Sequence, residues 1–149
     1  MYEIKVRMMN EAMARKLLEP LDLGAPHHVE TATHTYLTDA HVTRKIKNEQ
    51  GVFTYTIMQR HGAGFTSTAE EIPASRAEEL EREYPRRVAL NMTRTIWQVG
   101  EDTIALNVID NVGVFLEFRG EDFEMLKNWP RKIGFSEQHY LTRTYDELA

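Results

Sequence analysis

The chain contains no cysteine, so disulfide bonds and thiolate metal sites are excluded. It also has no excess of basic residues, because 18 Lys and Arg stand against 23 Asp and Glu in 149 residues, giving a formal net charge of −5. Domains that bind nucleic acid usually carry a basic excess, which argues against that partner. No apolar run is long enough to cross a bilayer, which argues against a membrane partner.

The first ten residues, MYEIKVRMMN, lack the apolar core of a signal peptide, so we expect a cytoplasmic location. Hydrophobic residues make up 42% of the chain and charged residues 28%, both ordinary for a folded domain. The length predicts a single domain over residues 1–149.

Strand-like alternation runs through much of the chain. Residues 2–8 carry apolar side chains at even positions, and Glu3, Lys5 and Arg7 lie at odd positions, which predicts a half-buried strand. Asn10 can cap a helix that Pro20 should disturb and that Gly24 ends. Further strands are predicted at 33–38, 41–48, 52–60, 65–72, 86–99, 103–109 and 112–118, with turns at 48–51 and 61–64, helices at 75–84 and 121–127, and a terminal turn at 142–149.

This alternation places charge of both signs on one face of several strands. The charges either cover the open, hydrated face of a sheet or, if the sheet closes into a barrel, line its interior. Charge of both signs inside a barrel is typical of a ligand site. The strand pattern therefore leaves open whether the charged face is a surface or a cavity.

Short motifs occur in a fixed order along the chain: MYEIK at the start, LDLGA after the first helix, Lys45 and Lys47 before a hairpin, LNVIDNVGVFLEFR, and RTYDEL at the end. Together they resemble the motifs of the CYTH superfamily, the triphosphate tunnel proteins that include class IV adenylyl cyclases and thiamine triphosphatases. The resemblance covers nearly the whole chain. It implies an α+β fold in which about eight antiparallel strands form a closed barrel with helices outside.

The chain departs from the family pattern at several places where relatives carry charge. Met1, Pro73, Asn107 and Arg119 replace family carboxylates, and Met58 and Met92 replace lysines. At Arg119 the change puts a cation where the family holds a metal ligand. We therefore expect an anion site to remain and at most one metal ion to bind.

The resemblance assigns roles to the remaining charged residues. Basic side chains grip phosphate oxygens, and carboxylates hold Mg²⁺ or Mn²⁺. The expected phosphate-binding residues are Lys5, Lys45, Lys47, Arg60, Arg94 and Arg119. The expected catalytic residues are Glu3 and Glu117, and the expected metal ligands are Glu3, Glu71 and Glu117. The implied interior also contains Arg7, Thr56 and Asn107.

The function implied is that of an enzyme that hydrolyses an organic or nucleoside triphosphate, with cyclisation a lesser alternative. A second hypothesis is a non-catalytic module that binds a phosphorylated small molecule without metal. A third is an enzyme that acts on a diphosphate with an apolar tail in a methionine-lined cavity, although packing explains Met58 and Met92 as well. Either a monomer or a homodimer is compatible with the resemblance.

Two further points concern single residues. Arg119 is expected either to contact phosphate or to form a buried ion pair with Glu117 or Glu71. The histidines match no zinc signature and are expected at the surface, although His34 or His41 near a tunnel mouth could shuttle a proton.

Overall fold

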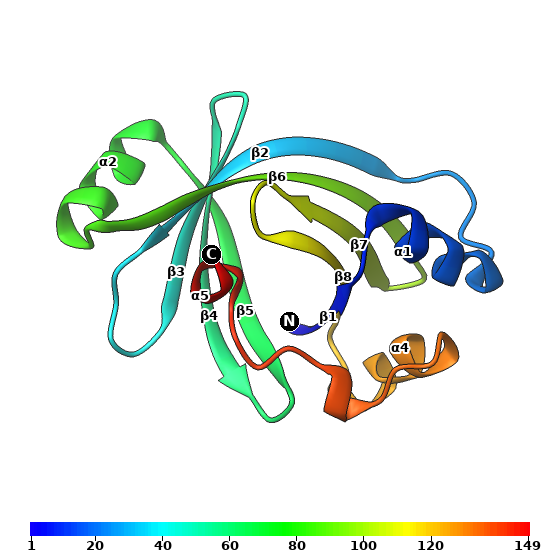
Figure 1. The fold of residues 1–149 in the computed structure, drawn as a ribbon. Helices are drawn as coiled ribbons and strands as arrows, with labels where there is room; N and C mark the ends of the chain where they lie inside the picture. The colour runs from blue at the N-terminus through cyan, green and yellow to red at the C-terminus, as the bar shows by residue number, and fades with distance from the viewer.

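The computed structural model describes residues 1–149 and contains eight antiparallel strands that close into a barrel (Figure 1). Around the barrel the strand order is β1-β5-β4-β3-β2-β6-β7-β8. The predicted α+β fold with a closed antiparallel barrel is confirmed. The strands are β1 (Tyr2–Met8), β2 (His28–Leu37), β3 (Thr43–Glu49), β4 (Val52–His61), β5 (Gly64–Ile72), β6 (Arg86–Val99), β7 (Asp102–Ile109) and β8 (Gly113–Gly120).

Short helices surround the barrel, and none is long and apolar enough to span a membrane. Helix α1 begins after Asn10, whose side-chain oxygen accepts a hydrogen bond of 2.8 Å from the Met13 backbone N–H. It ends before Pro20, which lies in a 3₁₀ turn. The helices are α1 (Glu11–Leu18), η1 (Glu19–Leu21), α2 (Ala74–Glu83), α3 (Phe123–Leu126), α4 (Asn128–Lys132), η2 (Glu137–His139) and α5 (Tyr145–Leu148).

Most boundaries agree with the sequence prediction to within two residues, and two elements differ more. Strand β2 begins at His28, five residues before the predicted start at Thr33, because its first half pairs with β6 rather than with the neighbouring hairpin. The single helix predicted at 121–127 is two short helices, α3 and α4, which meet at Lys127.

The barrel closes through a close approach between β1 and β5. Only Tyr2 with Thr66 and Glu3 with Phe65 pair across this seam. A Cβ atom at Gly64 would lie 2.5 Å from the backbone oxygen of Glu3, so only glycine allows the two backbones to come this close. The predicted turn at residues 61–64 therefore also supplies the closing contact of the barrel.

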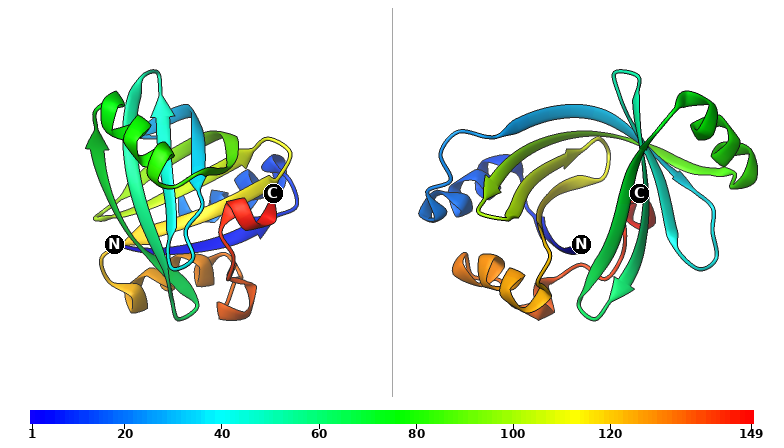
Figure 2. Two further views of the ribbon diagram at one scale, coloured as in Figure 1. Left: turned by 90° about the vertical axis from the view of Figure 1, so that its left-hand side faces the viewer. Right: turned by 180° about the vertical axis from the view of Figure 1, so that it is seen from behind.

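Apolar side chains on the outer face of the barrel pack against the helices. One group, which includes Ile4, Val6 and Phe118, lies under α1, α3 and α4, and a second group, which includes Ile46 and Tyr55, lies under α2. Figure 2 shows α2 on the opposite side of the barrel from α1 and α4. Because the helices cover the outer face, the charged face of the strands is left to line the interior.

One end of the interior is closed by apolar side chains. This end cluster consists of six buried residues, Tyr36, Leu90, Met92, Ile109, Phe115 and Tyr145. Tyr145 comes from α5 at the chain terminus and packs against Phe115, with ring centroids 4.8 Å apart. Met92 thus packs in an apolar cluster, which supports the packing interpretation of that methionine.

Candidate functional site

Next to the end cluster the barrel holds a polar cavity of about 70 Å³. Side chains from every strand except β7 line it, so its composition is set by residues far apart in the sequence. The lining residues are Glu3, His34, Lys45, Lys47, Thr54, Thr56, Ala69, Arg94, Glu117 and Arg119. The charged face predicted from strand alternation is therefore a cavity, and the open-sheet alternative is wrong.

A hydrogen-bonded network joins the cavity to the terminal helix. Arg94 donates to Glu117 Oε2 from Nη2 at 2.8 Å and to Asn107 Oδ1 from Nε at 2.9 Å. Asn107 donates from Nδ2 to the Tyr145 hydroxyl oxygen at 2.9 Å, and that hydroxyl donates to Glu117 Oε1 at 3.2 Å. Both oxygens of Glu117 are thereby occupied.

The surrounding cations keep Glu117 ionised. Burial alone would raise the pKa of this carboxyl, but Arg94, Lys5 and Arg119 outweigh burial and lower the pKa to about 2. The pKa of Arg94 is raised, because Glu117 and Glu30 favour its charged form more than burial disfavours it. The pair is therefore ionic throughout the neutral range.

Glu30 is a second buried acid, which the sequence analysis did not single out. Its side chain is 4% exposed, and it accepts hydrogen bonds from Lys47 Nζ at 3.2 and 3.4 Å. Arg94 Nη1 lies 3.7 Å from Glu30 Oε1. Lys47 and Arg94 are therefore already neutralised in part by an acid from β2.

Lys5 is almost fully buried, at 1% exposure, in a mixed environment. Its Nζ atom lies 3.8 Å from Glu3 Oε1 and donates to the sulfur of Met58 at 3.3 Å. The Phe65 and Tyr145 rings lie 4.5 and 4.9 Å from Nζ, within cation–π range. Lys5 thus holds the deepest positive charge, beside the end cluster.

Two cavity cations have no acidic partner. Lys45 forms no hydrogen bond or ion pair within the protein, and its nearest aromatic contact is the Tyr36 ring at 5.9 Å. Desolvation lowers the pKa of Lys45 to about 8, although Glu117 opposes the shift. Arg119 forms no ion pair, and its buried Nε has no hydrogen-bond partner. The expected alternative of an ion pair between Arg119 and Glu117 or Glu71 is therefore wrong.

His34 lies inside the cavity with 1% exposure, so the expectation of a surface position is wrong for this histidine. Neither ring nitrogen has a hydrogen-bond partner. Burial and the nearby Lys45, Arg94 and Lys47 lower its pKa well below the usual value, so the ring is neutral at pH 7. A neutral imidazole offers one donor and one acceptor to a ligand. A role for His34 in proton transfer stays a prediction.

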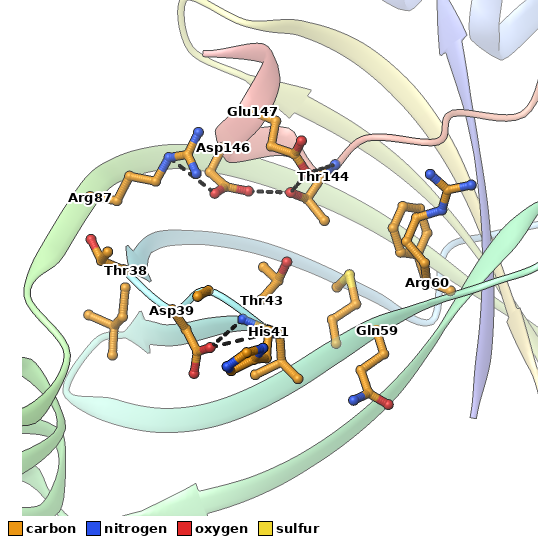
Figure 3. A pocket seen from close by; sticks show the side chains of 15 residues that line it. Thr38, Asp39, His41, Thr43, Gln59, Arg60, Arg87, Thr144, Asp146 and Glu147 are labelled. Atoms are coloured by element: carbon orange, nitrogen blue, oxygen red, sulfur yellow. Dashed lines mark hydrogen bonds and ion pairs between the residues drawn. The ribbon is translucent and has the colours of Figure 1, made fainter.

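Three predicted interior residues lie outside this cavity. Glu71 is exposed at the end of β5 and forms no ion pair, and Arg7 is exposed and donates to the Val112 backbone oxygen at 3.0 Å. Arg60 is exposed and donates to the Thr142 backbone oxygen at 3.1 Å. It lines a separate pocket of about 270 Å³ beside α5, together with Asp39 and Asp146 (Figure 3). The three side chains occupy sequence positions that face the interior of the barrel. Each lies near the end of its strand, beyond the cavity.

The three carboxylates expected to bind a divalent cation do not converge. Glu71 is outside the cavity, and Glu117 is bonded on both oxygens to Arg94, Asn107 and Tyr145. Glu3 alone presents an inward carboxylate without a hydrogen bond, and Lys5 lies beside it. Mg²⁺ needs several oxygen ligands in octahedral geometry, so this set does not fit a site made by the protein. Binding of Mg²⁺ together with a ligand's own phosphate oxygens stays a prediction.

The important residues that the sequence analysis missed come from β2 and the terminus. Glu30 and Tyr36 lie on the same face of β2 as His34, so placing the start of β2 at His28 would have added Glu30 to the interior set. The contact of Tyr145 with Asn107 and Glu117 had no such signal, because a terminal turn carries no strand register.

The closed antiparallel barrel with a charged interior is the fold that the resemblance to CYTH proteins led us to expect. No protein-family model and no curated protein matches the sequence.

Solved structures match over almost the whole chain. The PH1012 protein from Pyrococcus horikoshii has a TM-score of 0.82 at 18% identity, covering 99% of both chains. A candidate adenylate cyclase from Vibrio parahaemolyticus has a TM-score of 0.69 at 20% identity, covering 98% of this chain and 95% of that one. A candidate adenylyl cyclase from Hippeastrum, described as having a dominant triphosphatase activity, has a TM-score of 0.62 at 13% identity, covering 90% and 88%. At these identities the likeness establishes the fold.

Proposed function

We propose that the barrel binds the phosphate end of a small molecule, in the first instance an organic or nucleoside triphosphate. The observation that carries this proposal is the pair of cavity cations, Lys45 and Arg119, that have no acidic partner in the protein. Cations held in a low-dielectric cavity without a partner are costly, and an anionic ligand removes that cost. His34 adds a neutral donor and acceptor at the same place.

Charge balance around the cavity supports an anion over a neutral or cationic ligand. In and beside the cavity there are five cations, Lys5, Lys45, Lys47, Arg94 and Arg119, and three carboxylates, Glu3, Glu30 and Glu117, which leaves an excess of two positive charges while His34 is neutral. Three of the cations already have acidic partners: Lys5 lies beside Glu3, and Lys47 and Arg94 contact Glu30 and Glu117. Phosphate oxygens are the natural partners of the other two, because they accept several charge-assisted hydrogen bonds.

Hydrolysis of the bound triphosphate is a second candidate function. The inward carboxylate of Glu3 accepts no hydrogen bond from the protein and could orient a water molecule for in-line attack on phosphorus. Two solved structures of similar fold support this candidate. One is described as a candidate adenylate cyclase and the other as having a dominant triphosphatase activity, and both activities act at a phosphoryl group. Glu117, held ionised, would position Arg94 at the phosphates rather than carry a metal ion.

Calorimetric titration with a panel of phosphates tests both candidates. The panel is ATP, AMP, inorganic triphosphate, inorganic phosphate and, as uncharged comparison, adenosine, each with and without Mg²⁺. We expect ATP or inorganic triphosphate to bind without Mg²⁺ and adenosine not to bind. Release of inorganic phosphate from a bound triphosphate would establish hydrolysis. If no phosphate binds in either condition, the proposed function is wrong.

Affinity should depend on pH through Lys45. The pKa of Lys45 is about 8, so its positive charge is present below pH 8 and is lost as the pH rises above it. We expect the affinity for AMP, whose phosphate is already fully ionised there, to fall by up to about tenfold per unit above pH 8. The Lys45→Met variant should bind weakly and show no such step. An identical step in that variant would assign the titration to another group.

A further inference from the structure

A cluster of three metal-ligating side chains lies away from the predicted carboxylate set. It consists of His28 and Glu30 on β2 and Glu49 at the end of β3, whose donor atoms all lie within 4.8 Å of one another. Strand β2 runs from His28 to the region of Tyr36, which belongs to the apolar end cluster. The cluster therefore lies at the end of the barrel opposite α5.

Two of the three separations between the donor atoms match a tetrahedral metal site, and the third, between the two carboxylates, is within 4.8 Å. His28 Nε2 lies 3.5 Å from Glu30 Oε2 and 3.4 Å from Glu49 Oε2. With metal–ligand bonds of about 2.0–2.1 Å, neighbouring ligand atoms of a tetrahedron lie about 3.3–3.4 Å apart. A dication could therefore enter with little movement of the three side chains.

The exposure of the three side chains suits an ion that enters from solvent. The Glu30 side chain is 4% exposed and fixed by Lys47, whereas those of His28 and Glu49 are 48% and 28% exposed. One ligand is thus anchored and two can close on the ion, with a water molecule as the fourth ligand. One imidazole and two carboxylates suit zinc and other late first-row metals better than Mg²⁺, which prefers oxygen ligands and octahedral geometry.

We infer that His28, Glu30 and Glu49 form a binding site for a Zn²⁺-like dication at the end of the barrel opposite α5. The site does not depend on phosphate binding in the cavity. The two are nevertheless linked, because the ion would compete with Lys47 for Glu30 Oε2, which Lys47 Nζ contacts at 3.2 Å. Metal binding would thereby leave Lys47, which already lines the cavity, as a third cavity cation without an acidic partner.

Zn²⁺ titration of protein stripped of metal, followed by calorimetry at pH 7.5 without phosphate, tests this site. The wild-type protein should bind one Zn²⁺, and Mg²⁺ should not compete. His28→Ala and Glu49→Gln should each weaken binding by about 100-fold or more, since even outer partners of metal ligands cost 10- to 100-fold. Both side chains are partly exposed, so these variants should fold. His27→Ala is the matched control, because that neighbouring histidine is exposed and outside the cluster, and it should bind as the wild type does.

The Lys47→Gln variant distinguishes a metal site from an ordinary cluster of surface ion pairs. Removing the ammonium group that now contacts Glu30 should tighten Zn²⁺ binding by about tenfold, because a competing positive charge leaves the site. The inference is overturned if the wild-type protein binds no Zn²⁺, if His28→Ala binds it as tightly as the wild type, or if Lys47→Gln weakens binding. None of these results decides whether the cavity binds phosphate, which is measured separately in the absence of Zn²⁺.

Discussion

Replacing Lys45 and Arg119 together by methionine should remove phosphate binding almost completely. Each is a cavity cation without an acidic partner, and a hydrogen bond to a charged group contributes about 1.5–3 kcal/mol. We therefore expect each single variant to lose about 10- to 100-fold in affinity and the double variant about 1000-fold. Calorimetric titration with the tightest ligand of the phosphate panel measures these losses.

The double substitution should not destabilise the fold. A loss of phosphate binding can therefore be distinguished from a loss of stability. Lys45 bears a desolvation cost that no acid offsets, so the free energy of unfolding of Lys45→Met should rise by about 1 kcal/mol. Lys16→Met with Arg82→Met is the matched control, because it removes the same charge from exposed positions that form no ion pair. If the control loses as much affinity as the cavity variant, net charge rather than the cavity governs binding.

Arg94→Met should have the largest effect on stability. It removes the only salt-bridge partner of Glu117 and one partner of Glu30, so that a buried carboxylate keeps only more distant cations. Removing one member of a buried ion pair typically costs about 3–5 kcal/mol. We expect a fall of that size in the free energy of unfolding at pH 7, measured by urea denaturation.

Adding Glu117→Gln to Arg94→Met should restore much of that stability, because no buried charge is then left unpaired at this position. The pH dependence gives an independent check. In the wild type, the pKa of Glu117 is about 2, below its usual value of 4.5, so the stability due to its ionised form is present above pH 4.5 and lost as the pH falls toward 2. Arg94→Met should weaken this dependence, because Arg94 is the largest of the cationic contributions to the lowered pKa of Glu117. A double variant as unstable as the single one would show that Arg94 stabilises the barrel by packing alone.

The sequence predicted the architecture well because strand alternation and turn residues act locally. The apolar even positions and charged odd positions of β1 identified both faces before any partner was known. Gly51 and Asn48 form the predicted hairpin turn, in which the Gly51 N–H donates to Asn48 Oδ1 at 2.9 Å. The motif order then implied that the strands close.

The site was predicted less completely, because alternation fixes which face a side chain occupies but not its depth along the barrel. Arg60 and Glu71 have the inward positions, yet they lie beyond the cavity at the ends of β4 and β5. The predicted set also lacked Glu30, whose two cationic partners change the charge balance of the cavity.

The sequence by itself determined the strands, their turns and which face of each strand carries charge, since alternation and turn residues act locally, whereas the closed barrel was an expectation from the resemblance to CYTH proteins. Only the tertiary structure decided which charges cancel. Lys45 and Arg119 are unpaired while Arg94 is paired, because strand tilt and barrel closure set the distances between side chains on different strands. Those distances, not the number of basic residues, determine where an anion can bind.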